Sequence, residues 1–375
     1  MARTTISIST NALEWAMKRM GQSPRDLEND FPKIEEWLLG DTSPTFPQVE
    51  ALAQALGLPS AVLFARSPPD LPDPTKSFRS LPMSYRRKLP RHLMKRIIAA
   101  QSYQISTQEV FGPENQRLNR KVLDAIRKGK NARHAAAAAR SIFGVSFEEQ
   151  RSWNGDAGEA LAKWRTMFFE AGIFVFLDAL KSNDVSGFCL YDKNFPIIVL
   201  NNSHAKSRQI FTLFHELAHI GKEVGGIDSL KVDPDRLDEK HSGIERYCDN
   251  FAAEFLAPIS ELKRLVHNRP DAKDIEEIAR SLKISRLVVL RSFFSEGLVD
   301  RQDYSKLMQL WIKSGSNSGS GGNYYNTKRA YLGNEFLSRV FQLYNSARID
   351  NEDASRLLDV APKNLEGLRP RGLGI

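Results

Sequence analysis

The sequence predicts a mainly helical α+β protein, and three observations lead to this fold class. Segments with apolar residues at helical spacing fill most of the 375 residues. Three short runs rich in Val, Ile and Phe interrupt them between residues 172 and 202, as β-strands would. Proline-rich and Ser/Gly-rich stretches separate a helical N-terminal part, a central part with the strands and a small helical C-terminal domain.

The N-terminal part, residues 1–66, is predicted to hold five short helices. The first covers residues 11–21 and ends at a glycine, and the second has Ser23 as a candidate N-cap before Pro24. Three more are expected in KIEEWLLG, TFPQVEALAQALG and PSAVLFA. Five short helices in this order suggest a helix-turn-helix bundle.

The predicted recognition helix of this bundle is acidic. It carries Glu35 and Glu36 against Lys33, whereas contacts with phosphates and base edges favour Arg, Lys, Asn and Gln. The segment from Leu27 to Trp37 is also short for two helices and a turn. DNA binding and a role as a protein-interaction or dimerisation module both stay open.

Residues 67–130 are predicted to form a basic linker and helical connector. The connector begins with SPPDLPDPT, whose prolines disfavour helix. Residues 76–108 hold eight Lys or Arg and no acid, and residues 117–140 hold Asp124 as their only acid. Such stretches usually form solvated helix faces, although they also suit nucleic acid or an acidic partner. The net charge of +8 permits nucleic-acid binding without establishing it.

The central part, residues 131–313, combines the strands with long helices. The strands are expected in GIFVFL, SGFCLYD and PIIVLNN, and the helices FTLFHELAHIG (211–221) and IERYCDNFAAEFLAP (244–258) follow. A Ser/Gly linker, SGSNSGSGGN, leads to residues 324–375, the predicted C-terminal helical domain. The aromatic residues of that domain are more typical of a core than of a recognition surface.

The segment FTLFHELAHIG has the residue types of a metal-dependent hydrolase. On a helix, His215 and His219 lie one turn apart on one face, so both can offer a ring nitrogen to one ion. Glu216 projects beside that face, where it can take a proton from a water held by the metal and pass it to a leaving amine. The alternative is an amphipathic helix whose histidines bond to carboxylates or backbone.

A catalytic zinc needs three protein ligands, and helical phase favours Glu245 as the third. Glu245 leads an otherwise small or apolar face of the second helix, while Glu254 points to the opposite side. A carboxylate on such a face needs a partner, and a metal is a good one. A surface ion pair at the helix start is the alternative. The candidates weighed beside Glu245 are His204, His241, Asp249 and Glu254.

Cys248 lies close to Glu245 on the same helix and is a further candidate ligand. A small buried hydrophobe is its more common role. Cys248 and Cys189 are the two cysteines of the chain and form no CxxC pair, which argues against a disulfide framework. A cytoplasmic location is expected, because the sequence shows no signal peptide and no apolar run as long as a membrane span.

FTLFHELAHIG followed by IERYCDNFAAEFLAP resembles the ImmA/IrrE family of metallopeptidases. GFCLYDKNFPIIVLNN is similar to the strand pair before the HExxH helix of that family. WLLGDTSPTFPQVEALAQALGLP resembles the end of an Xre-like helix-turn-helix domain, a common companion, and GGNYYNTKRAYLGNEFLSRV resembles segments of two-domain members. The resemblance is specific over residues 186–258 and looser elsewhere.

The resemblance implies a zincin-like peptidase domain that cleaves a protein substrate, a transcriptional repressor or similar regulator. The implied metal ligands are His215, His219 and Glu245, and Glu216 is the implied general base. The implied metal is zinc, with manganese as a second possibility. Family members often carry alanine and asparagine where this chain has Cys248 and Asp249, so Asp249 adds an acid that can tune or compete for the metal.

A second class of function also fits the sequence. The chain could be a DNA-binding transcriptional regulator or an antitoxin-like partner protein whose metal site is structural or sensory. The Xre-like start and the basic stretches motivate this reading. DNA is therefore a possible partner, through the N-terminal domain or the basic stretches, and no membrane partner is expected.

Overall fold

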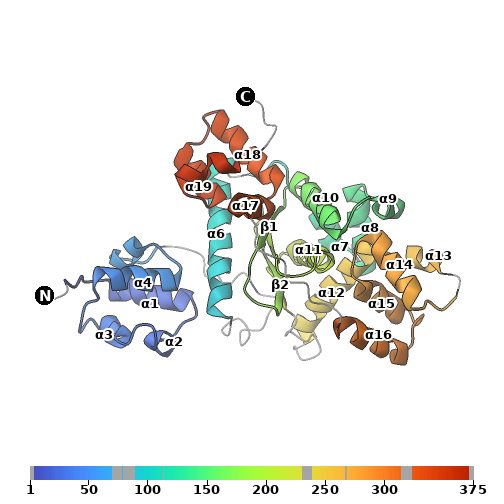
Figure 1. The fold of residues 1–375 in the computed structure, drawn as a ribbon, viewed down its shortest axis with the longest axis horizontal. Coiled ribbons are helices and arrows are strands. Elements are labelled where there is room, and N and C mark those ends of the chain that lie inside the picture. The colour runs from blue at the N-terminus through green and yellow to red at the C-terminus, as the bar shows by residue number, and fades with distance from the viewer. Residues whose placement is uncertain are drawn as a thin grey trace. The chain divides into compact units, whose positions relative to one another are not determined.

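The computed structural model describes residues 4–69, 78, 89–112, 114–229, 239–266, 268–313 and 323–370 (Figure 1). Most of the predicted SPPDLPDPT linker, part of the basic stretch 76–108 and nearly all of the predicted Ser/Gly linker lie outside these residues. The chain divides into two compact units, residues 1–102 and 103–375. The mainly helical α+β class predicted from the sequence is confirmed.

The first unit is a small helical bundle. Its elements, in chain order, are α1 (Thr10–Arg19), α2 (Pro24–Glu28), α3 (Ile34–Leu39), α4 (Phe46–Leu56), the 3-10 helix η1 (Ser60–Phe64) and the start of α6 (Arg91–Phe111). Ser9 accepts a hydrogen bond from the Ala12 N–H and so caps α1, and Ser23 and Asp26 form a capping box on α2. Leu13, Leu27 and Trp37 are among the buried residues of its core. The helices expected between residues 11 and 66 are therefore present, the last as a 3-10 helix.

The second unit contains one mixed sheet. Its strands are β1 (Phe174–Asp178), β2 (Val185–Leu190), β3 (Ile197–Asn201) and β4 (Ile227–Ser229), in the spatial order β1-β3-β2-β4. β1 runs parallel to β3, and β2 runs antiparallel to both β3 and β4. The first three strands match the sequence-predicted ones to within a few residues, whereas β4 was not predicted.

Helices surround this sheet. After the end of α6, four more precede it: α7 (Arg120–Lys128), α8 (Ala132–Phe143), α9 (Phe147–Ser152) and α10 (Ala157–Glu170). Then come α11 (Lys206–Gly221), α12 (Glu239–Leu256), α13 (Ile259–Leu265), α14 (Ala272–Leu282), α15 (Arg286–Ser295) and α16 (Arg301–Lys313). Among the described residues, no helix has both the length and the apolar character that crossing a membrane requires.

α11 lies directly against the sheet and forms the centre of the second unit. At Gly187 of β2, a Cβ atom would come within 2.7 Å of the Thr212 Cγ2 of α11, so the close approach depends on glycine. On its other side, the Phe214 ring packs against the rings of Trp164 and Phe255 at centroid distances of 4.9 and 4.1 Å. These contacts fix the rotation of α11 between the sheet and α12.

Two of the C-terminal helices, α17 (Tyr324–Leu332) and α18 (Asn334–Asn345), lie against the outer strand β1 (Figure 1). They are followed by α19 (Asn351–Leu358) and two 3-10 helices, η4 (Pro362–Asn364) and η5 (Glu366–Leu368). The Phe336 ring packs on Phe174 and Phe176 of β1, at centroid distances of 5.9 and 5.2 Å. Phe336 is 2% exposed, so it contributes to the core rather than to a recognition surface.

Candidate metal centre

Two packed helices bring the sequence-predicted site residues together. α11 supplies His215, Glu216 and His219, and α12 supplies Glu245. All four side chains are buried, with exposed fractions of 3%, 0%, 0% and 5%. Buried polar groups need partners, so the donor atoms here must be satisfied by one another or by a ligand.

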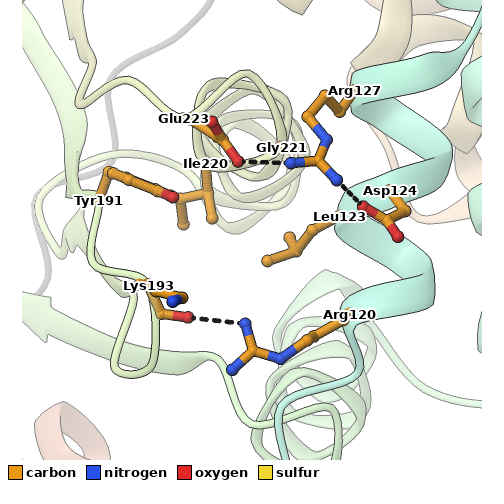
Figure 2. A pocket seen from close by; sticks show the side chains of 9 residues that line it. All are labelled: Arg120, Leu123, Asp124, Arg127, Tyr191, Lys193, Ile220, Gly221 and Glu223. Atoms are coloured by element: carbon orange, nitrogen blue, oxygen red, sulfur yellow. Dashed lines mark hydrogen bonds and ion pairs between the residues drawn. The ribbon is translucent and has the colours of Figure 1, made fainter.

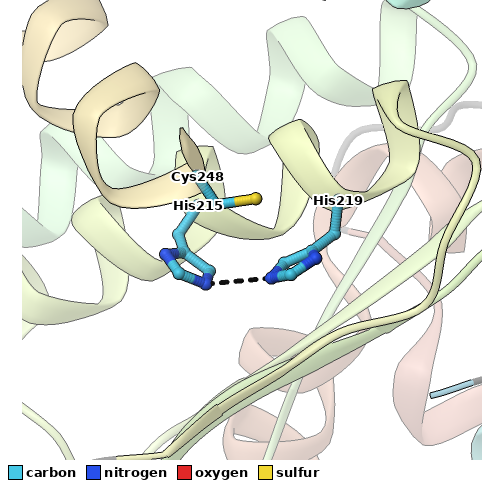
Figure 3. A group of neighbouring side chains, drawn as sticks. All are labelled: His215, His219 and Cys248. Atoms are coloured by element: carbon cyan, nitrogen blue, oxygen red, sulfur yellow. Dashed lines mark hydrogen bonds between the residues drawn. The ribbon is translucent and has the colours of Figure 1, made fainter. Parts of the chain in front are cut away.

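Three donor atoms form a compact triangle. The two histidine Nε2 atoms lie 3.1 Å apart, with the rings facing each other in Figure 3. Glu245 Oε2 lies 3.3 Å from His215 Nε2 and 3.5 Å from His219 Nε2. Ligands about 2.0–2.1 Å from a tetrahedral zinc ion lie roughly 3.3–3.4 Å from each other. The residues therefore fit a zinc ion without rearrangement of these three side chains.

Two carboxylate oxygens at this centre are buried and have no hydrogen-bond partner among the described residues. They are Glu245 Oε1 and Glu216 Oε2. An unsatisfied buried carboxylate oxygen is costly, and a cation close by is the usual compensation. The chemistry of the donor set thus agrees with the spacing of the triangle.

Asp249 contacts His215 at Nδ1, the ring nitrogen that is not part of the triangle. Its Oδ1 lies 3.0 Å from His215 Nδ1, and its Oδ2 accepts a hydrogen bond of 2.9 Å from Arg291 Nη1 on α15. This contact leaves His215 Nε2 free to face the triangle, the arrangement in which carboxylates commonly orient metal-binding histidines. The sequence placed Asp249 near the site, but it gave no sign of Arg291.

Protonation in the metal-free centre follows from these contacts. Burial acts to lower the pKa of His215, but the hydrogen bonds to Asp249 and Glu245 outweigh it and raise that pKa well above the ordinary value. Burial acts to raise the pKa of Glu245, but the two histidines outweigh it and hold that pKa well below its usual range. Both shifts favour a protonated His215 beside an ionised Glu245.

Glu216 lies beside the triangle and is held by β4. Its Oε1 accepts a 3.1 Å hydrogen bond from the Asp228 backbone N–H. The Asp228 side chain is fixed in turn by Arg208, through bonds of 2.8 and 2.9 Å, and by Thr212. Burial raises the pKa of Glu216. A carboxylate with a raised pKa is better suited to exchange protons near neutral pH.

Cys248 is the second candidate for the third donor. The Cys248 Sγ and one ring nitrogen from each histidine all lie within 4.8 Å of one another (Figure 3). We favour Glu245 as the donor, because its oxygen lies 3.3 and 3.5 Å from the two nitrogens and the histidines hold the pKa of its carboxyl well below the usual range. Burial raises the pKa of the Cys248 thiol well above its usual value, which favours the neutral thiol as long as no metal is bound.

Three other sequence candidates lie on α12 or just before α11. Glu254, on the opposite face of α12, forms an ion pair with Arg133 at 3.7 Å and accepts a hydrogen bond from the Ile259 N–H at 3.4 Å. His204 is half-buried in the loop before α11. His241 lies in the first turn of α12, four residues before Glu245.

Gly226 is a residue of the site that the sequence did not indicate. The loop between α11 and β4 passes directly over His219, and a Cβ atom on Gly226 would lie 2.4 Å from His219 Cδ2. The Gly226 N–H donates to Cys189 Sγ at 3.2 Å, and the Gly226 carbonyl accepts from the Cys189 N–H at 3.0 Å. Only glycine lets the loop lie this close to the imidazole.

A comparison with known protein families places this centre in context. Residues 170–293 match the model of a peptidase family that is described as an IrrE N-terminal-like domain. The matched stretch includes α11, α12 and Arg291. No curated protein and no solved structure gives a significant match to the chain. The match supports the ImmA/IrrE family for this part of the chain.

Proposed function

We propose that this ImmA/IrrE-type metallopeptidase domain is a zinc-dependent endopeptidase that cleaves a regulatory protein. The observation that carries the proposal is the triangle of His215 Nε2, His219 Nε2 and Glu245 Oε2, with sides of 3.1, 3.3 and 3.5 Å. Three protein donors with one open position are typical of catalytic rather than structural zinc sites.

In this proposal the three triangle residues hold the metal. Two imidazole nitrogens and a carboxylate oxygen suit zinc best, and the same donor set also accepts manganese. A bound zinc ion supplies Lewis-acid polarisation of the scissile carbonyl and brings the pKa of a water close to neutral. The remaining chemistry belongs to the side chains around it.

Glu216 is the proposed general base. Its Oε2 has no hydrogen-bond partner among the described residues, so it is free to take a proton from the attacking water and to give one to the leaving amine. The Asp228 N–H holds the other oxygen and limits rotation of the carboxylate. Asp249 and Arg291 are positioning residues, since they act through His215.

The substrate proposed here is a transcriptional repressor or a similar regulator. A protein substrate follows from the peptidase family. The more specific proposal of a repressor rests on the resemblance to ImmA/IrrE proteins alone. Both cysteines are free and buried, which agrees with a reducing cytoplasm as the proposed location.

The test compares wild type with Glu216→Gln in a lysate that contains the intended substrate. New protein N-termini are identified by mass spectrometry after incubation, and metal content is measured in parallel. We expect a small set of new N-termini with wild type, at least about 10²-fold fewer with Glu216→Gln, and equal metal in both. Equal cleavage by both proteins would contradict the role of Glu216.

The alternative, a DNA-binding regulator with a structural metal, has no specific observation in its favour within the described residues. Helix α3 carries Glu35 and Glu36 in its first turn and no basic residue in its last turn. Acidic residues oppose contact with phosphates. DNA binding through the basic stretches stays a prediction.

A further inference from the structure

A second feature of this unit is a cavity of about 280 Å³, lined by α7, the C-terminal end of α11 and the residues after β2 (Figure 2). Leu123 of α7 and Ile220 of α11 give it apolar walls. Tyr191 reaches toward it from the segment after β2 (Figure 2). None of these residues belongs to the metal centre.

The charges around the cavity are divided between two sides. On one side Arg127 pairs with both acids of the lining: its Nη1 lies 2.8 Å from Glu223 Oε1, and its Nη2 contacts Asp124. These three groups together carry one negative charge. The carboxylates are therefore already engaged with a guanidinium and are held on that side, as Figure 2 shows.

On the other side, two cations face the cavity without a carboxylate. Arg120 donates to Asn194 Oδ1 at 2.9 Å and to the Lys193 carbonyl oxygen at 3.3 Å, and both acceptors are neutral. The Lys193 ammonium forms no ion pair with a described residue. The three cations and two carboxylates of the lining leave one net positive charge, concentrated at Arg120 and Lys193.

We propose that this cavity binds a small organic anion. A carboxylate or phosphomonoester would lie between Arg120 and Lys193, because a guanidinium held by neutral acceptors keeps its charge for a ligand. The apolar body of the ligand would lie against Leu123 and Ile220. The volume is slightly below the range of about 300–1,000 Å³ for small-molecule sites, so it suits a metabolite-sized ligand rather than a folded partner.

The position of the cavity ties it to the metal-binding helix. Ile220 and Gly221 of its lining directly follow His219. The same helix α7 is bonded to α12, since the Tyr247 hydroxyl donates to the Ile126 carbonyl oxygen at 2.9 Å. An occupant would therefore contact the end of α11 beside a metal-site histidine. The proposal stands on the cavity itself and does not depend on peptidase activity.

The test is isothermal titration calorimetry of the full chain with phenyl phosphate as the probe. Inorganic phosphate and neutral phenyl glucoside are titrated beside it. The variants are Arg120→Gln and Lys193→Gln, and the control is Lys273→Gln, which removes a cation that is 83% exposed and lines no part of this cavity. Lys193→Gln removes only the charge of that side chain. Arg120→Gln also removes the two hydrogen bonds that Arg120 donates to the Lys193 carbonyl oxygen and to Asn194 Oδ1.

We expect one phenyl phosphate per chain, with affinity about tenfold weaker in each variant and unchanged in Lys273→Gln. Inorganic phosphate and phenyl glucoside should both bind more weakly than phenyl phosphate, because each lacks one of the two contacts. Four results would overturn the proposal: no binding at millimolar probe, unchanged affinity in both variants, equal loss in the control, or equal affinity for either comparison ligand. If the probe bound to the metal instead, its affinity would be unchanged in Arg120→Gln and Lys193→Gln, which is the second of these results.

Discussion

Helices α11 and α12 of the second unit place charged residues in the opposite way from helix α3 of the first unit. In α11 and α12, His215, His219 and Glu245 point inward and are at most 5% exposed. In α3, Glu36 points outward, and its 3.6 Å contact with Lys33 is a surface ion pair with both side chains well exposed. Burying polar groups is costly, whereas exposing them is not.

This difference in burial distinguishes a candidate metal site in α11 and α12 from a solvent-exposed surface in α3. The buried side chains of α11 and α12 have donor atoms at the spacing of metal ligands and carboxylate oxygens without hydrogen-bond partners among the described residues, and both features favour a bound cation. The exposed acids of α3 are solvated by water and need no other partner. Their negative charge opposes contact with the phosphates of DNA. The first region lies within the part of the chain that matches a known family, and it has a donor set that demands a ligand. The second region has neither of these features among the described residues. The following predictions test whether the two regions are as different as this comparison requires.

The largest effect is expected from Gly226→Ala. The new Cβ would meet the His219 ring at 2.4 Å, so the buried imidazole or the loop must move. We expect a loss of about 1–3 kcal/mol in the free energy of unfolding, as for overpacked cores, together with loss of zinc binding. Urea denaturation and zinc titration measure the two effects.

Gly243→Ala is the matched control for that substitution. Gly243 lies inside α12, and its added Cβ would meet nothing within 4 Å. Alanine is the better helix former by about 0.8–1.0 kcal/mol, so this variant should be slightly more stable than wild type and keep its zinc. Equal behaviour of the two variants would show that Gly226 does not hold the loop over His219.

The next largest effect on zinc binding is expected from Asp249 and Arg291, which orient His215. Asp249→Asn replaces the carboxylate that bonds to His215 Nδ1 and should weaken zinc binding about 10–100-fold. Arg291→Gln removes only the partly exposed partner of Asp249, so its effect should be smaller. Competition with a zinc chelator measures both. If Arg291→Gln weakened zinc binding more than Asp249→Asn, the proposed order of contacts would be wrong.

A pH effect of intermediate size should accompany zinc binding. The pKa of His215 is raised well above 6.5 in the metal-free protein, because its bonds to Asp249 and Glu245 outweigh burial. The raised pKa favours the protonated form of His215, which must lose its proton to bind zinc. Affinity should therefore rise with pH, by up to about tenfold per unit, until pH exceeds this pKa.

Calorimetry in two buffers of different ionisation enthalpy measures that proton release at pH 7. About one proton per zinc is expected for wild type, and fewer for Asp249→Asn, because the substitution removes a bond that raises the His215 pKa. Identical heats in the two buffers would contradict a protonated His215.

The smallest effect is expected in the first unit. Glu36→Ala removes an exposed side chain that contacts Lys33 and accepts from the Thr42 hydroxyl. The free energy of unfolding should change by about 0.5 kcal/mol or less, and metal content should not change. Loss of metal in this variant, measured by mass spectrometry of the metal, would show that the two regions are not independent.

The sequence predicted the parts of this molecule that local patterns control. Runs of Val, Ile and Phe predicted the first three strands, and helical phase placed Glu245, Cys248 and Ala252 on one face that is indeed buried. β4 was missed because three residues, Ile227–Ser229, carry no alternation to recognise. Its register comes from pairing with β2, which local sequence does not show.

The supporting residues of the centre were not predictable, for a different physical reason. Arg291 reaches Asp249 from α15, far along the chain, so the contact depends on how the helices pack. The role of Gly226 depends on the path of a loop over His219. Neither contact has a fixed spacing in sequence, whereas the two histidines share one helical turn.

Metal content of the purified protein tests the central claim most directly. Inductively coupled plasma mass spectrometry would compare wild type, Glu245→Ala and Glu254→Ala, two glutamates of α12 on opposite faces. The account predicts about one zinc per chain in wild type and Glu254→Ala, and loss of zinc in Glu245→Ala. Equal zinc in both variants, or none in wild type after reconstitution, would contradict the three-ligand site.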